Sequence, residues 1–260
     1  MEQVQTIAAP AERGYFTETQ WPIYSAALVL PFLLIYQTGL VVLKSKVING
    51  GDAIINILSH TLFRTVGVEV AFASMIVPIC AFLIWQYRKP GPWTVQPQLL
   101  MATFFESLIY AVILYMMLGY FVHFIASSTV PASAPVAMAS RSHSTGPRPE
   151  LQDFVLFCGA GVYEELVFRV FLLGLLMLVF TKLFHMEHAH AAAWSTLTGA
   201  VIFSAFHHIG GEPFAINPFV QRILAGIYFS AIYFTRSFGV AAASHALYDI
   251  VVGLDQWKHG

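Results

Sequence analysis

Residues 154–184 read FVLFCGAGVYEELVFRVFLLGLLMLVFTKLF, an apolar stretch interrupted near its centre by Glu164, Glu165 and Arg169. About 20 apolar residues suffice to cross the hydrocarbon of a bilayer, so this stretch exceeds one span and predicts a tilted or broken membrane helix. A charged side chain at that depth costs about 2.5–3.5 kcal/mol on insertion scales. Acids that are kept at such a cost indicate a catalytic site inside the membrane.

The composition of the whole chain agrees with a membrane protein. Of its 260 residues, 57% are hydrophobic and 10% are charged, and the mean hydropathy is +0.68. Soluble domains have about 45–50% apolar and about 25% charged residues, so this chain falls in the membrane class. The formal net charge of −1 and the lack of a basic stripe disfavour nucleic-acid binding. Cys80 and Cys158 lie in apolar segments and suggest neither a disulfide framework nor a metal site.

Apolar runs of about 20 residues predict seven membrane helices, and one shorter run leaves an eighth open. The long runs cover residues 24–43, 66–85, 101–125, 154–184, 191–207, 216–235 and 240–254, and the short run covers 53–63. The expected fold class is all-α, a polytopic transmembrane helical bundle of about seven to eight helices with a water-accessible intramembrane cavity. The expected location is an integral, multi-pass position in a membrane, which in a bacterium would be the cell (inner) membrane.

One segment divides the chain by its composition. Residues 126–150 are rich in Ser, Ala and Pro and predict a loop, because they cannot bury enough apolar surface to order themselves. Residues 1–125 would then form an N-terminal part with about three transmembrane spans. Residues 151–260 would form a catalytic membrane half, which contains the acidic motif and the two histidine motifs described below.

The acidic motif separates into two roles. Glu165 and Arg169 are four residues apart in the order that favours a helical ion pair, so we expect them to form a structural clasp. Glu164 is five residues from Arg169, about 140° around an ideal helix. It therefore has no expected partner on its own helix and is a candidate general base. The alternative is an ion pair that only holds helices together, with a second glutamate at the water interface.

Two later apolar segments each contribute a histidine. His207 follows Phe203 by four residues and His245 precedes Asp249 by four, so each pair shares one helix face. Asp249 could accept a hydrogen bond from one ring nitrogen of His245 and leave the other nitrogen facing a cavity. A simple hydrogen bond between helices remains the alternative for each histidine. His208 points about 100° away from His207 and is not expected in the site.

In this order the three motifs resemble the signature of the CAAX protease and bacteriocin-processing family, whose best-known members are the type II CAAX prenyl endopeptidases. The motifs read Glu164-Glu165-x-x-x-Arg169, Phe203-x-x-x-His207 and His245-x-x-x-Asp249. The resemblance covers about residues 154–254, whereas the first half of the chain is similar only in being helical and apolar.

The resemblance implies an intramembrane endopeptidase, a glutamate protease that hydrolyses a peptide bond of a membrane-associated or lipid-anchored substrate. Glu164 and His207 would activate water, and His245 with Asp249 would stabilise the oxyanion, while Glu165 and Arg169 would support the site. Members with asparagine at the last position always have an N–H donor there, whereas Asp249 donates only when it is protonated. His245 is therefore expected to be the main oxyanion donor.

No metal and no other cofactor is expected, since the chain has no HExxH zinc motif. A metal site built from Glu164, His207 and His245 has acceptable ligand types and remains a less favoured mechanism. The expected partners are the lipid bilayer and a membrane peptide or protein substrate, including substrates processed near the C-terminus. The alternative functions are a non-enzymatic scaffold or bacteriocin-immunity protein of the same family and, less favoured, a proton-coupled transporter.

Overall fold

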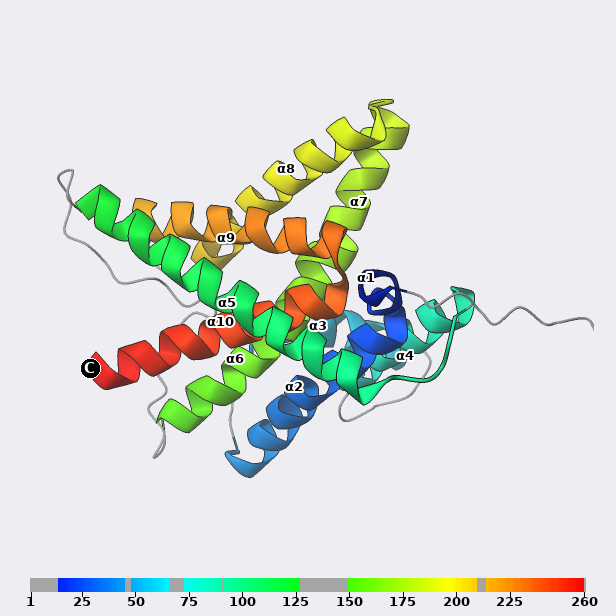
Figure 1. Ribbon diagram of the computed structural model, residues 1–260, viewed down its shortest axis with the longest axis horizontal. Helices are drawn as coiled ribbons and strands as arrows, with labels where there is room; N and C mark the ends of the chain where they lie inside the picture. Colours follow the sequence, from blue (N-terminus) through cyan, green and yellow to red (C-terminus); the bar gives the residue numbers. More distant parts are fainter. Residues whose placement is uncertain are drawn as a thin grey trace, which may run out of the picture.

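The computed structural model of the chain describes residues 14–44, 48–65, 73–89, 91–126, 149–209 and 214–259. Throughout these ranges the regular secondary structure is helical, which confirms the predicted all-α class (Figure 1). The elements are α1 (Tyr15–Glu18), α2 (Pro22–Val42), α3 (Gly50–Thr65), α4 (Ala73–Arg88), α5 (Pro97–Ala126), α6 (Pro149–Glu165), η1 (Leu166–Leu172), α7 (Leu173–Leu178), η2 (Val179–Leu183), α8 (His188–Ile209), α9 (Ile216–Thr235) and α10 (Phe238–His259).

Four helical stretches in the described ranges are long and apolar enough to cross a membrane, which supports an integral membrane protein. They are α2, α5, the continuous stretch from α6 to η2, and α10. The other predicted runs also form helices, and α9 has the predicted bounds Ile216–Thr235. The short run 53–63 becomes α3, a separate helix of 16 residues. Residues 66–72 of the predicted second run lie outside the described residues, and α4 covers the rest.

The apolar stretch that contains the acidic motif forms one continuous but irregular helix. It runs from α6 through η1 to α7 and η2, and Figure 1 shows α6 leading into α7. The segments η1 and η2 have π-helical hydrogen bonding. Short π segments inside α-helices occur frequently at functional sites. Here η1 begins directly after Glu165 and contains Arg169, so the backbone changes its winding inside the acidic motif.

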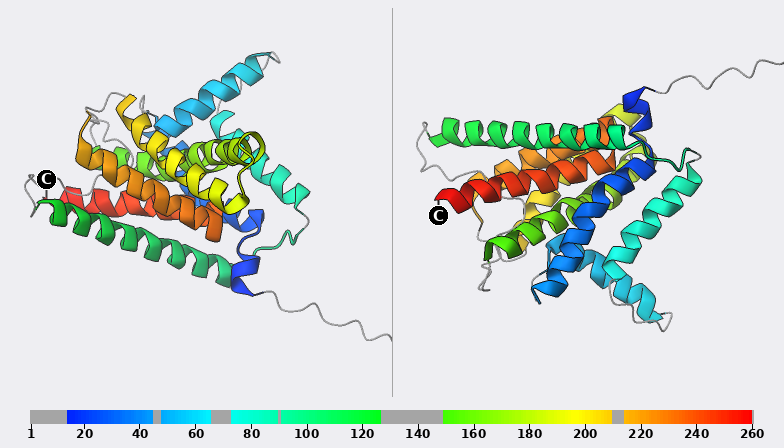
Figure 2. Two further views of the ribbon diagram at one scale, coloured as in Figure 1. Left: turned by 90° about the horizontal axis from the view of Figure 1, so that it is seen from above. Right: turned by 60° about the horizontal axis from the view of Figure 1, so that its bottom comes forward.

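Helix α10 is the centre of the bundle. It is 72% buried over its most apolar window, against 22–39% for the other three candidate spans. It packs against α6, α5 and α2, and Figure 2 shows α5 and α10 side by side along much of their length. A Cβ atom at Gly161 of α6 would lie 2.4 Å from the backbone nitrogen of Ala246, so only glycine fits at this crossing. The close contact places His245 directly beside the acidic end of α6.

A polar cluster ties the N-terminal segment to the bundle. The guanidinium of Arg236, which precedes α10, donates from Nε to Oε1 of Glu106 (2.5 Å) and from Nη2 to Oε2 (2.7 Å). Tyr15 of α1 donates to the same Oε2 (2.6 Å), and Arg236 also donates to the hydroxyl of Thr19 (3.1 Å). Burial, followed by the hydrogen bond to Glu106, raises the pKa of Tyr15. The cluster therefore fixes α1 against α5 and the start of α10.

The predicted loop at 126–150 falls almost entirely outside the described residues. Helices from both sides of it share one apolar core, because α2 packs against α6 and α10 while α5 packs against α10. The division into 1–125, 126–150 and 151–260 remains a prediction from the sequence.

Candidate active site

The acidic motif and the two histidine motifs come together in the interior of the bundle. Glu164 and Glu165 are the last two residues of α6, His207 lies in the last turn of α8, and His245 and Asp249 lie on consecutive turns of α10. Exposure of the five residues is 2%, 0%, 7%, 0% and 0%, in that order. Buried ionisable side chains need partners, because an isolated charge in an apolar interior is strongly destabilising. The contacts below supply those partners.

Glu165 occupies the centre of one ionic group. Its Oε2 lies 3.1 Å from Nε of Arg169, which is the ion pair expected from their spacing. Its Oε1 lies 2.9 Å from Nδ1 of His245, which reaches it from α10. The guanidinium of Arg169 also lies over the ring of Phe203, 5.1 Å from its centroid. Glu165 thus links the acidic helix to the histidine of α10 as well as to its own arginine.

The contact between His245 and Asp249 differs from the expected one. Nε2 of His245 lies 3.6 Å from Oδ2 of Asp249, which is longer than a hydrogen bond. The hydrogen bond that orients the ring comes instead from Nδ1 to Glu165. The expectation that Asp249 fixes the tautomer of His245 is therefore wrong, because the pairing across helices is shorter than the pairing along α10. The ring of His245 also stacks on Phe229 at 4.7 Å between centroids.

Glu164 and His207 form a second pair whose donors and acceptors can be assigned. Nδ1 of His207 lies 2.9 Å from the carbonyl oxygen of Phe203. A carbonyl oxygen only accepts hydrogen bonds, so Nδ1 must have the hydrogen, and Nε2 of a neutral ring must be an acceptor. This Nε2 faces Oε2 of Glu164 at 3.7 Å.

The ionic group around Glu165 and the pair formed by Glu164 and His207 lie close together, with aromatic rings packed between them. Phe203 lies between the two histidines, with its ring centroid 5.0 Å from that of His207 and 6.2 Å from that of His245. Both His245 and Asp249 are close enough to Glu164 to interact with it electrostatically. The site therefore joins three buried carboxyl groups, two imidazoles and one guanidinium within apolar walls. Such an arrangement can take up and release protons away from bulk water.

Asn49 is a site residue that sequence reasoning did not identify. It precedes α3, and its Nδ2 donates to Oε1 of Glu164 at 2.8 Å. Glu164 and Asn49 are 115 residues apart in sequence, and the short run at 53–63 gave no reason to place its start in the site. The signal that could have been used is Asn49-Gly-Gly-Asp52, because asparagine before a helix is a preferred N-cap.

Other polar groups lie apart from this cluster. His208 packs against the rings of Phe214 and Phe219, in agreement with its exclusion from the predicted site. His190, in the first turn of α8, and Glu187, which precedes the helix, form an exposed pair with a separation of 3.5 Å. Over the ranges that the structure describes, no group of three or more His, Cys, Asp or Glu side chains is arranged to hold a metal ion.

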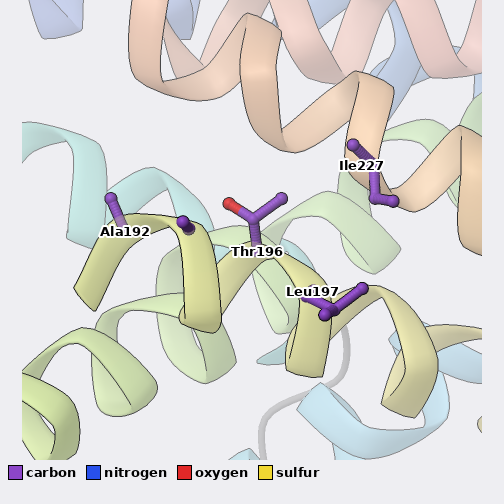
Figure 3. Close-up of a pocket in the computed structure, with 5 residues that line it drawn as sticks. Ala192, Thr196, Leu197 and Ile227 are labelled. Carbon is purple, nitrogen blue, oxygen red and sulfur yellow. The ribbon is translucent and has the colours of Figure 1, made fainter. Parts of the chain in front are cut away.

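A separate apolar pocket lies between α8 and α9. Ala192, Thr196 and Leu197 of α8 and Ile227 of α9 line this pocket (Figure 3), whose volume is about 360 Å³. Thr196 precedes His207 by 11 residues on the same helix, which corresponds to roughly 16 Å along its axis. The pocket has no ionisable lining residue and is distinct from the candidate active site.

One of the comparisons with known proteins gives a family match for part of the chain. The family model described as Type II CAAX prenyl endopeptidase Rce1-like matches residues 149–251, a range that contains all three motifs. The comparisons with curated proteins and with solved structures gave no match. The resemblance drawn from the motifs is thereby confirmed, and the family is one of proteases. Residues 149–251 of the chain are thus similar to the Type II CAAX prenyl endopeptidase Rce1-like family, which is what the motifs indicated.

Proposed function

We propose that the protein is an intramembrane glutamate endopeptidase in which Glu164 and His207 activate the hydrolytic water. The observation that supports this most strongly is the pair of facing acceptors, Oε2 of Glu164 and Nε2 of His207, at 3.7 Å. A water molecule bound beside this pair would donate a hydrogen to Oε2 of Glu164 and lie within reach of His207. The hydrogen bond to Glu164 would direct a lone pair of the water oxygen toward a bound peptide carbonyl.

The chemical step follows from these positions. The water oxygen attacks the carbonyl carbon of the scissile peptide while its proton passes to Oε2 of Glu164. The carbonyl double bond opens, and the negative charge moves to the carbonyl oxygen. When this intermediate collapses, the C–N bond breaks and the proton held by Glu164 passes to the leaving nitrogen. The products are a carboxylic acid, which retains the second hydrogen of the water and then loses it to solvent or to the amine, and an amine; Glu164 returns to its starting carboxylate.

His245 is the residue that we assign to the oxyanion, with Asp249 behind it. Its Nδ1 is engaged by Glu165, and its Nε2 has no protein hydrogen-bond partner within the described residues. A doubly protonated ring can donate from Nε2 to a developing oxyanion, and the nearby carboxyl of Asp249 stabilises that charged ring. Arg169 and Glu165 hold the ring through the ionic group. In this assignment Glu165 orients His245, and Asp249 balances the charge of the ring and does not itself donate.

The substrate class follows from the surroundings of the site. The acidic pair lies on a helix that is apolar enough to span a bilayer, so a peptide must approach it from within or beside the membrane. The family name points to C-terminal CAAX tails with prenyl groups. We therefore propose a membrane-associated or lipid-anchored protein, cut near its C-terminus, as the substrate.

The test compares C-terminal peptides of membrane proteins from cells that produce the wild-type protein or a variant at equal abundance. Glu164→Gln and His207→Gln should each abolish the same set of fragments. Glu150→Gln is the matched control, since Glu150 is an exposed residue in the first turn of the same helix. Identical fragments from wild-type and Glu164→Gln cells would reject the protease and favour the scaffold or immunity function.

A further inference from the structure

We propose that Asn49 is a positioning residue for Glu164, supplied by the part of the chain that precedes the family match at 149–251. The inference rests on the proposed function of Glu164 as the base. Asn49 is 7% exposed, and its Nδ2 donates to Oε1 of Glu164 at 2.8 Å. The other oxygen of the same carboxylate, Oε2, is the one that faces His207. The amide therefore holds the carboxylate in the orientation that directs its reactive oxygen at the histidine.

The orientation of the amide is itself determined by a second hydrogen bond. Oδ1 of Asn49 accepts from the backbone N–H of Gly51 at 2.7 Å. An amide oxygen accepts and an amide nitrogen donates, so this contact turns Nδ2, and not Oδ1, toward Glu164. The same contact is a helix N-cap, because Gly51 lies in the first turn of α3. One side chain thus caps α3 and donates to the carboxylate.

A buried chain of hydrogen bonds fixes the backbone of Asn49. Its N–H donates to the hydroxyl of Tyr36 at 3.1 Å, and that hydroxyl donates to Oδ2 of Asp52 at 2.8 Å. Tyr36 and Asp52 are 0% and 2% exposed. The tyrosine comes from α2, so two helices of the N-terminal part hold the residue in place.

The start of α3 also touches the backbone of α6 at the candidate base. A Cβ atom at Gly51 would lie 2.7 Å from the backbone nitrogen of Glu164 and 2.7 Å from the carbonyl carbon of Tyr163. Glycine is required for this approach, because no larger residue fits between the two backbones. The main chain of Glu164 and the cap of α3 are therefore in direct contact, and Asn49 completes the contact at the side-chain level.

Two substitutions separate the donor from the cap. Asn49→Ser keeps a preferred N-cap residue but is too short to reach Glu164. Asn49→Asp keeps the size and the cap but replaces the donor with an acceptor. Asn217→Ser, in the first turn of α9, is the matched control. The substrate for kinetics is a synthetic peptide that spans the cleavage site found by the fragment comparison.

We expect both Asn49 variants to lower kcat roughly 100-fold, the loss that a misplaced catalytic group produces, while KM changes less than about threefold. The melting temperature of Asn49→Ser should be close to that of the control variant Asn217→Ser. If kcat stays within threefold of wild type in both variants, the positioning role is wrong. If kcat falls only in proportion to lost folded protein, Asn49 is merely a structural cap.

An infrared measurement tests the contact between Asn49 and Glu164 independently of whether the protein is a protease. The carboxyl bands that disappear in Glu164→Gln belong to Glu164, and they should move in Asn49→Ser but not in Asn217→Ser. Unmoved bands would overturn the contact between Asn49 and Glu164, whatever the enzyme does. Bands that move, together with fragments that do not depend on Glu164, would instead retain the contact and reject the protease.

Discussion

The substitution Arg169→Ala tests the buried ionic group that Glu165 forms with Arg169 and His245. The guanidinium is 1% exposed, and Glu165 is 0% exposed, with 3.1 Å between Nε and Oε2. Opposite unit charges at this distance attract by about 5 kcal/mol at an effective dielectric constant of roughly 20. The net cost of removing one partner from a buried pair is about 3–5 kcal/mol, because the remaining charge loses its compensation. His245 still contacts Glu165, so we expect a loss near the lower bound, about 3 kcal/mol.

The measurement is the free energy of unfolding in mixed detergent micelles, together with the amount of folded protein in the membrane. Arg88→Ala is the matched control, because Arg88 is an exposed residue at the end of α4. A double-mutant cycle with Glu165→Gln isolates the pair, and the double variant should lose less than the two single variants together. Equal stability of Arg169→Ala and Arg88→Ala would refute the clasp, since no buried charge would then have been stranded.

Two further predictions concern the N-terminal anchor and the cofactor. Arg236→Ala should lower the free energy of unfolding by about 3 kcal/mol, because Glu106 loses both hydrogen bonds that it accepts from the guanidinium. Protection of α1 against hydrogen exchange should also fall, and an unchanged exchange pattern would show that the cluster does not anchor α1. Cleavage should survive thorough chelation, and loss of activity that is restored by added zinc would favour the metal site of Glu164, His207 and His245.

Local patterns in the sequence predicted the parts of the site that depend on helix geometry. Glu165 and Arg169 are four residues apart, so helical periodicity alone places them in contact. The same periodicity put His245 and Asp249 on one face. It also separated Glu164 from the clasp, which left it available for a partner on another helix. The apolar runs located most of the helices because the hydrophobic requirement of a membrane span depends on composition and length.

Contacts between distant segments could not be predicted in this way. The pairing of Glu165 with His245 spans 80 residues and that of Asn49 with Glu164 spans 115 residues. Each depends on how helices pack, which no periodicity within one helix specifies. For the same reason the sequence assigned the orientation of His245 to Asp249, its neighbour on α10, and not to Glu165. The π segments after Glu165 were also not foreseen, because the stretch has no proline to mark a change of winding.

The glycine crossing between α6 and α10 has a structural consequence. Because the backbones approach each other directly at Gly161, no side chain separates α6 from α10 at this point. Glu165 and His245 therefore lie on two helices that are in direct backbone contact. His207 belongs to α8, whose packing neighbours are α9, α7 and the π segments. The two histidines of the site are thus held by different helix contacts, since Glu165 and His245 depend on the α6–α10 crossing and His207 on the packing of α8.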